Sequence, residues 1–212
     1  MTSAPDRPSV LLAALGPTAD ALRPEVAQYA EGPGDGIAVC DGVFSVAGSR
    51  WGRFGLLARP FVGPRLMITS YGADVPFHVE NRLEQAPDGA AELRATRTFR
   101  FARRTETFVD VLRVGEQSGT LVNRLGAAQR VELTLRCEAT PEGHLRLRSE
   151  RAVLRLGRLR IPLPGVFSVS VQVEDGFDDD TGCQTVRALA RNPLLGTVLT
   201  YRGSFRWRIR HP

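Results

Sequence analysis

From Met67 to the C-terminus, apolar and polar residues alternate with a period of two. In one such segment Phe77 and Val79 are flanked by His78 and Glu80, and the same alternation returns after Leu93, Val131, Val169 and Leu199. A period of two is typical of strands that bury one face and expose the other. This part of the chain therefore predicts a sheet of roughly eight to ten strands.

The connections between these segments are short. PDG at 87–89 and PEG at 141–143 have the composition of tight turns, which favours antiparallel neighbours over βαβ units. A long sheet must curl or close to protect its edges, and a barrel of about eight strands leaves room inside for one small ligand. We expect a mainly β, antiparallel up-and-down barrel or half-barrel of lipocalin type, and the pattern leaves closure open.

The N-terminal third has a different character. Residues 1–9 predict a frayed tail, Thr18 is a candidate cap for a helix over Ala19–Ala30, and EGPGDG at 31–36 predicts a loop. A strand with a bulge near Gly42 follows, and RWGRFGLLARPF at 50–61 predicts a short lid-like helix. With 212 residues the chain is expected to form a single domain.

Composition excludes several classes of protein. All 28 basic residues are arginines, and on the predicted strands they alternate with apolar residues, which places them on the solvent face and argues against nucleic-acid binding. Cys40, Cys137 and Cys183 are far apart, which argues against a disulfide framework or a zinc site and favours a reduced, cytoplasmic protein. No apolar run is long enough to span a membrane, and no nucleotide motif is present, so we expect neither metal nor cofactor.

Arg97 is the most informative single residue, because alternation places it on an otherwise apolar face with Phe99 and Phe101. If 102–105 form the turn, Arg97 lies opposite Asp110, and Phe99 opposite Phe108. A buried guanidinium needs such a partner. The pair has two interpretations, a structural salt bridge, or a ligand-anchoring or catalytic role in which Arg97 and Asp110 are candidate catalytic residues.

Other candidate site residues follow from the same alternation. Glu106 is the remaining acid or base candidate, whereas His78 falls on the solvent face. The acidic run EDGFDDDTG at 174–182 lacks the spacing of a calcium loop and predicts a solvated hairpin loop. The side chains expected to line a ligand pocket, beside Arg97, are Tyr71, Phe99, Phe101, Phe108, Tyr201 and Trp207.

Four segments together resemble a known family: RTFRF at 97–101, LVNRLGAAQRVELTLRC from Leu121, HLRLRSERAVLRLGRLRIPLP from His144, and NPLLGTVLTYRGSF from Asn192. They are similar to domain-of-unknown-function family 4166. The resemblance implies a domain that occurs alone or behind a saccharopine-dehydrogenase-like reductase, and it implies no catalytic residue. Ala95 and Asn123 depart from it, because a tryptophan and an acidic residue are expected there.

Three hypotheses for function follow. The first is a barrel that binds a lipophilic small molecule with Arg97 at its polar contact, and whose enzymatic form is a cofactor-free biosynthetic cyclase or isomerase that preorganises its substrate. The second is an accessory domain that docks on a reductase through an apolar patch around Trp51, Phe54 and Phe61. The third is a structural or homodimerising protein.

Overall fold

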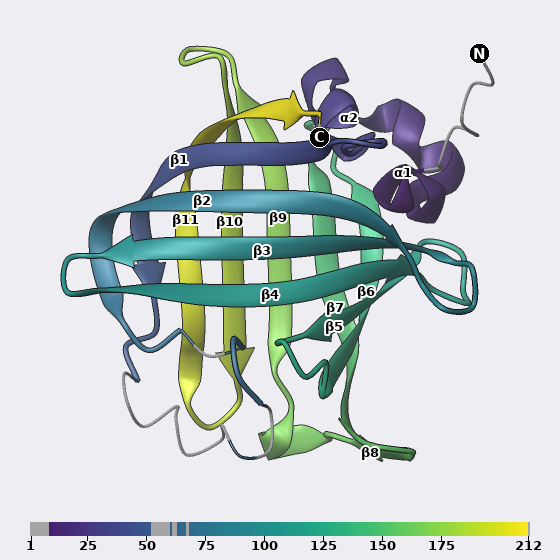
Figure 1. Cartoon of the computed structure of the whole chain (residues 1–212), viewed down its shortest axis with the longest axis vertical. Helices are drawn as coiled ribbons and strands as arrows, with labels where there is room; N and C mark the ends of the chain where they lie inside the picture. The colour runs from purple at the N-terminus through teal and green to yellow at the C-terminus, as the bar shows by residue number, and fades with distance from the viewer. Residues whose placement is uncertain (1–8, 52–59, 61–62, 67, 212) are drawn as a thin grey trace.

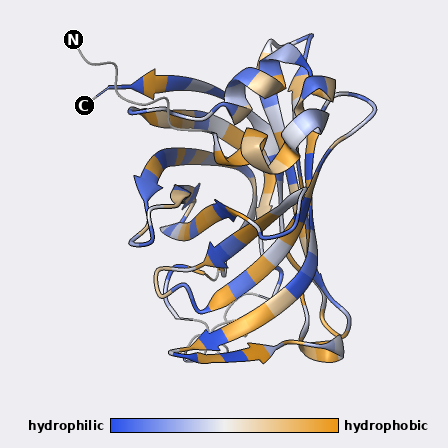
Figure 2. Cartoon of the chain, turned by 90° about the vertical axis from the view of Figure 1, so that its right-hand side faces the viewer, coloured by the Kyte–Doolittle hydropathy of each residue, from blue (hydrophilic) through white to orange (hydrophobic). Residues whose placement is uncertain are grey.

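The computed structural model describes residues 9–51, 60, 63–66 and 68–211, and in them antiparallel strands predominate (Figure 1). Hydrophilic and hydrophobic residues follow one another along the strands, as the alternation predicts (Figure 2). The strands are β1 (Ile37–Gly48), β2 (Tyr71–Gln85), β3 (Ala91–Phe101), β4 (Arg104–Val114), β5 (Thr120–Leu125), β6 (Val131–Ala139), β7 (Leu145–Leu156), β8 (Leu159–Pro162), β9 (Ser170–Asp178), β10 (Cys183–Asn192) and β11 (Gly196–Arg210).

The sheet closes on itself. Neighbours follow chain order from β1 to β7, β7 pairs with β9, and β9, β10 and β11 lead back to β1. The closing pair runs from Ile37 opposite Arg210 to Gly48 opposite Thr200. β8 pairs only with β7, so ten of the strands form the ring. The mainly β, antiparallel barrel is confirmed, and closure pairs both edges of every strand in the ring with a neighbour.

The irregularity in β1 is not where the sequence predicts it. The register against β11 shifts between Phe44 and Val46, so the bulge expected near Gly42 is wrong. Gly42 serves another purpose, because a Cβ there would collide with the backbone of Ser204 on β11. The two strands approach too closely at this point for a side chain.

The N-terminal segment forms three short helical pieces rather than one helix over Ala19–Ala30: α1 (Val10–Leu15), the 3₁₀ helix η1 (Gly16–Ala21) and α2 (Pro24–Ala30). The predicted helix cap, Thr18, is also wrong. Ser9 accepts the Leu12 N–H at 3.2 Å, whereas the Thr18 hydroxyl donates to the Leu15 carbonyl at 2.8 Å. Pro24 can begin α2 because the N–H groups of a helix's first turn have no hydrogen-bond partner within the helix, so the N–H that proline lacks is not missed.

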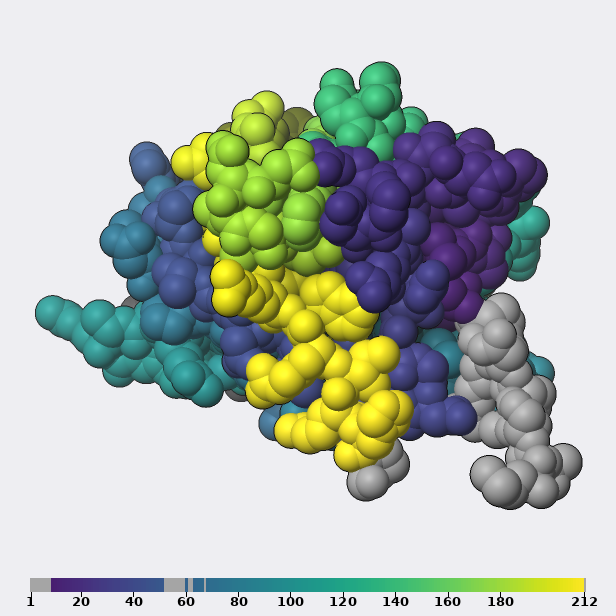
Figure 3. Space-filling model, turned by 90° about the horizontal axis from the view of Figure 1, so that it is seen from above, coloured from purple at the N-terminus to yellow at the C-terminus, as the bar shows by residue number. Residues whose placement is uncertain are grey.

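These helices lie over one end of the barrel, which we call the helix end (Figures 1 and 3). Val26 of α2 packs there against a core that includes Leu121, Leu135 and Leu145. A second core cluster is aromatic, with Phe44 stacked on Phe77 at 3.8 Å between ring centroids. The predicted lid-like helix at 50–61 falls almost wholly outside the described residues.

Candidate functional site

Arg97 and Asp110 form an ion pair inside the barrel, as the sequence predicts. The Asp110 side chain is 3% exposed and the Arg97 side chain 22% exposed. The guanidinium also lies over the Phe108 ring, with 5.9 Å from its central carbon to the ring centroid. Arg97 is thus held by a carboxylate and an aromatic face while part of its surface stays accessible.

The register that led to this pair is wrong by two residues. The turn consists of 102–103 alone, so Phe101 lies opposite Arg104, Arg97 opposite Phe108, and Phe99 opposite Glu106. Asp110 lies opposite Ala95 and is the diagonal neighbour of Arg97. The pair survives because a shift of two residues preserves the face of the sheet, and the long arginine side chain spans the diagonal.

Asp175 is the functional candidate that the sequence analysis missed. It belongs to β9, opposite Leu145 of β7 and Val186 of β10, on the inner face of the barrel. The predicted solvated loop over 174–182 is therefore wrong for 174–178, and only 179–182 form the turn. The signal was present, because the alternation through Val171 and Val173 continues to Asp175.

Burial raises the pKa of Asp175 to about 7, against the opposing effect of the Arg97 charge. Within the described part of the chain its carboxyl group makes no hydrogen bond or ion pair. A carboxylic acid with a pKa near neutrality can both accept and donate a proton at physiological pH. Asp175 is half-buried, and an acid with a perturbed pKa and no partner is a recurrent feature of functional sites.

Tyr29 reaches into the barrel from α2. Its hydroxyl accepts a hydrogen bond from Asn81 Nδ2 at 3.3 Å and lies 3.9 Å from Cys40 Sγ. Its ring packs against Phe205 and Trp207, with centroid distances of 5.3 and 5.7 Å. Burial raises the pKa of Tyr29 well above its ordinary value and that of Cys40 to about 12, so both stay protonated at neutral pH.

Arg97 and Asp175 act on the same set of groups. The Arg97 charge lowers, and the Asp175 charge raises, the pKa of Tyr29, Cys40 and Tyr201, whose dominant shift comes from burial. These side chains therefore share one interior of low polarity. We call this set the interior cluster; it consists of Tyr29, Cys40, Asn81, Arg97, Asp110, Asp175 and Tyr201.

Apolar side chains surround the interior cluster without burying one another completely. Phe99 is fully buried, and Tyr201 packs against it at 5.9 Å between centroids. The inward-facing side chains that keep part of their surface accessible include Phe101, Phe108, Val173, Val186, Leu199, Tyr201 and Trp207. Partly buried apolar side chains thus adjoin a small number of polar groups, a combination that small-molecule sites also have.

One of the predicted site residues, Tyr71, lies elsewhere. Tyr71 is 42% exposed, and its hydroxyl accepts a hydrogen bond from Arg50 at 3.2 Å. His78 lies on the outer wall with Nδ1 2.7 Å from Asp41 Oδ1, consistent with its predicted solvent face. Tyr71 therefore belongs to the surface in this structure and not to the wall of the interior.

Glu106 is saturated with donors. Thr69 N–H donates to it at 2.6 Å, the Ser70 hydroxyl at 2.8 Å, and Arg104 pairs with it at 2.8 Å. Burial opposes ionisation, but the hydrogen bonds from Thr69 and Ser70 outweigh it and lower the pKa of the Glu106 carboxyl. Through these contacts Glu106 of β4 holds Thr69 and Ser70, the two residues that precede β2. A catalytic role for Glu106 stays a prediction.

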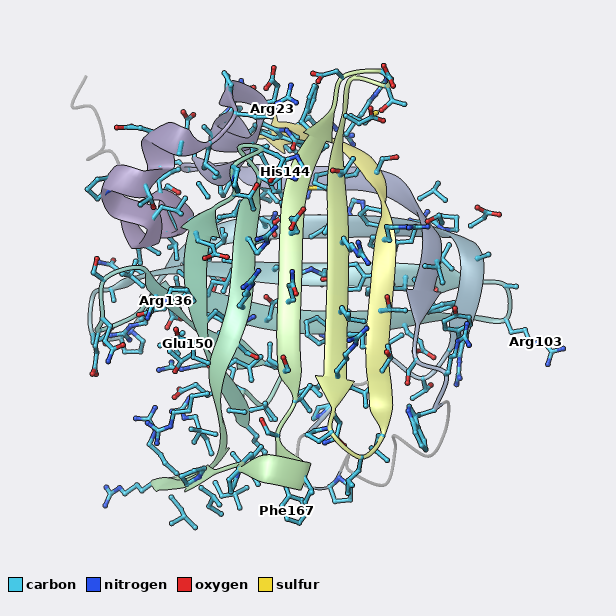
Figure 4. The ribbon with its side chains drawn as sticks, turned by 180° about the vertical axis from the view of Figure 1, so that it is seen from behind. Arg23, Arg103, Arg136, His144, Glu150 and Phe167 are labelled. Atoms are coloured by element: carbon cyan, nitrogen blue, oxygen red, sulfur yellow. The ribbon has the colours of Figure 1, made fainter. Side chains whose placement is uncertain are left out.

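A groove of about 470 Å³ lies on the outer wall of the barrel rather than inside it. His144 and Glu174 lie on one side of it and Arg187 and Arg202 on the other, and Figure 4 shows His144 close to the helix end. His144 Nδ1 is 3.2 Å from Glu174 Oε1. Charged side chains and apolar surface, including Val43 and Val186, both line the groove, and no member of the interior cluster does.

The described residues contain no group of three metal-ligating side chains, and Cys40, Cys137 and Cys183 are free thiols. Among the helices in the described part of the chain, none has the length and apolar character needed to cross a membrane.

Comparison with known proteins places the chain in a family. A family model described as "Domain of unknown function (DUF4166)" matches residues 22–205. The uncharacterized protein YndH of Bacillus subtilis (strain 168) is 27% identical over 141 residues, which cover 66% of this chain and 69% of that protein. No solved structure matches. Because the family model covers nearly the whole barrel, the chain belongs to the DUF4166 family.

Proposed function

We propose that the barrel binds a lipophilic small molecule in its interior, with the polar group of that molecule between Arg97 and Asp175. The observation that carries this proposal is the interior cluster, in which a partly accessible guanidinium and an unpaired carboxyl group face accessible apolar side chains. A barrel folded only for stability gains little from such groups, because uncompensated polar burial costs free energy.

The charges restrict the polar group of the ligand. Asp110 already neutralises Arg97, and Asp175 adds a second carboxyl group in the same interior. A ligand carboxylate would meet both acids as well as the guanidinium. A neutral hydroxyl or carbonyl group instead accepts a hydrogen bond from Arg97 or from protonated Asp175 without introducing charge. We therefore expect an uncharged lipophilic alcohol, ketone or ester.

In the enzymatic form of the proposal the reaction is a proton transfer without cofactor or metal. Asp175 takes a proton from the carbon next to a carbonyl group whose oxygen is bound by Arg97, and returns it to another carbon of the same molecule. The products then have the same atoms and charge as the substrate, so the reaction is an isomerisation or a ring closure. An acid with a pKa near the working pH is the group that such a step requires.

The hypothesis that the protein docks on a partner is supported by one residue of the predicted apolar patch. Trp51 is 38% exposed, and its indole N–H donates to the Leu195 carbonyl at 3.0 Å, so one member of the predicted patch lies on the surface. Phe54 and Phe61 fall outside the described residues. Association with a reductase or a second copy therefore remains an alternative that rests on Trp51.

The interior site is tested by filling it. We expect Val173→Trp, which adds a large side chain on the inner face, to weaken binding of the neutral dye Nile red at least about tenfold, because the ring occupies ligand volume. Gln172→Trp is the matched control: it places the same ring next in sequence but on the outer face, and it is expected to bind as the wild type does. Fluorescence titration measures both affinities.

Native mass spectrometry of freshly purified protein complements the titration. A neutral lipophilic mass that accompanies the wild type, and is absent from Val173→Trp but present in Gln172→Trp, is the expected result. If both tryptophan variants bind dye and native ligand like the wild type while circular dichroism shows an intact fold, the interior is not the binding site.

A further inference from the structure

The end of the barrel opposite the helices carries exposed apolar side chains. Phe167 and Leu194 are each 72% exposed and Leu159 is 58% exposed. They belong to two connections of this end, and Figure 4 shows Phe167 beyond the ends of the strands. We call this the basal end; the parts of its connections that the structure describes are 49–51, 60, 63–66, 68–70, 102–103, 126–130, 157–169 and 193–195.

The apolar side chains are carried on a fixed frame. Asn192 Nδ2 donates to the carbonyl groups of Val166 and Ser168 at 2.7 and 2.8 Å, and its Oδ1 accepts the N–H groups of Leu194 and Leu195 at 3.0 Å each. Asn192 is itself buried, so it ties the β10–β11 turn to the 3₁₀ helix η3 (Gly165–Phe167). The exposure of Phe167 and Leu194 is therefore a feature of the folded structure.

Charge separates the two ends of the barrel. The sequences of the basal connections contain no Asp or Glu, and their described arginines are Arg50, Arg65, Arg103, Arg130, Arg158 and Arg160. The connections of the helix end, at 31–36, 86–90, 115–119, 140–144 and 179–182, contain no Arg. They carry the acids Glu31, Asp35, Asp88, Glu116, Glu142, Asp179 and Asp180.

Two exposed arginines near the apolar side chains are available for a partner, whereas Arg160, next to Leu159, pairs with Glu132. Arg158 in the β7–β8 turn and Arg191 beside the β10–β11 turn are exposed, and neither forms an ion pair with any residue that the structure describes. Arg103 lies apart from Phe167, at the tip of the β3–β4 hairpin (Figure 4). Leu159 and Leu194 thus each have an exposed, unpaired arginine close by in the sequence.

We propose that the basal end docks on an anionic lipid surface, with Phe167, Leu194 and Leu159 inserted among the lipids and Arg158 and Arg191 at the headgroups. Separate protruding turns suit a fluid surface better than a rigid protein, whose interface needs a matching shape. The acidic helix end is repelled by the same surface, so the charge separation fixes which end approaches. This inference goes beyond the proposed ligand site and does not depend on it.

Vesicle flotation with the full chain tests the proposal. We expect the protein to float with vesicles of phosphatidylcholine and phosphatidylglycerol in equal parts, not with phosphatidylcholine alone, and to be released by high salt, which screens the arginines. Equal binding to both kinds of vesicle, or no binding to either, would overturn it. A salt-insensitive dimer that does not bind vesicles would assign the basal end to a second copy instead.

Substitutions separate local contacts from net charge. Phe167→Ser with Leu194→Ser is expected to weaken vesicle binding at least about tenfold. Arg158→Gln with Arg191→Gln is expected to weaken it roughly thirtyfold. The matched control, Arg187→Gln with Arg206→Gln, removes the same charge from the outer wall and should change binding about twofold or less. If the control pair weakens binding as much as the basal pair, the basal end is not the docking surface.

Discussion

Asp110→Ala is expected to lower the free energy of unfolding by about 4 kcal/mol, because removal of one member of a buried ion pair leaves the other charge without compensation. Asp110 is almost fully buried, whereas Arg97 keeps a fifth of its side chain accessible, so water relieves only part of the cost. Urea unfolding followed by circular dichroism measures the change. The loss should appear in the midpoint of the transition with little change in its slope.

Two controls isolate the effect of burial. Asp88→Ala breaks the ion pair of Asp88 with Arg113 at 2.8 Å, where Asp88 is 53% exposed, and we expect a much smaller loss because solvent screens an exposed pair. Arg97→Met combined with Asp110→Leu replaces both partners by apolar groups and should recover most of the stability that Asp110→Ala loses. A loss below about 1 kcal/mol for Asp110→Ala would show that Arg97 is solvated without its partner.

The predictable part of the structure is the part governed by local alternation. A strand shows its face in its own sequence, so the inward position of Arg97, Phe99 and Phe101 follows from a few consecutive residues. The ion pair with Asp110 was also predictable, although its register was not, because a two-residue turn and a four-residue turn place the same faces together. The face on which a residue lies is therefore easier to predict from sequence than the residue that lies opposite it on the next strand.

The missed features depend on distant parts of the chain or on a competing local signal. Asp175 shares its inner face with Val173, but the neighbouring acids 178–180 gave the whole run the composition of a loop. Closure through β1 and β11 joins residues far apart in sequence, which no short pattern contains. Tyr29 enters the interior only because α2 covers the barrel end, and the sequence does not show which strand a helix will meet.

The interior cluster becomes more informative when its two acids are compared. Asp110 is ion-paired and compensates Arg97, so its role is accounted for by stability. Asp175 lies in the same interior without a partner in the described structure, and Arg97 lowers its pKa too little to offset burial. The two carboxyl groups thus have different surroundings, and Asp175 is the one left available to a ligand.

The pH dependence of stability tests this state of Asp175. Its folded pKa of about 7 lies above the ordinary value of 3.8, so between these values the folded protein holds a proton that the unfolded chain has lost. The contribution of Asp175 to the free energy of unfolding therefore falls as pH rises through this window, by up to about 4 kcal/mol. Asp175→Asn cannot ionise and lacks this loss.

We therefore expect Asp175→Asn to gain stability relative to the wild type as pH rises from 4 to 9, since 3.8 and about 7 bound the titration. Unfolding by urea at intervals of pH measures the difference between the two proteins. That difference cancels the opposite trend of paired acids such as Asp41 and Glu80, whose pKa values are lowered by their partners. A difference that does not change with pH would mean that Asp175 ionises freely, and the proton transfer proposed for it would then lose its physical basis.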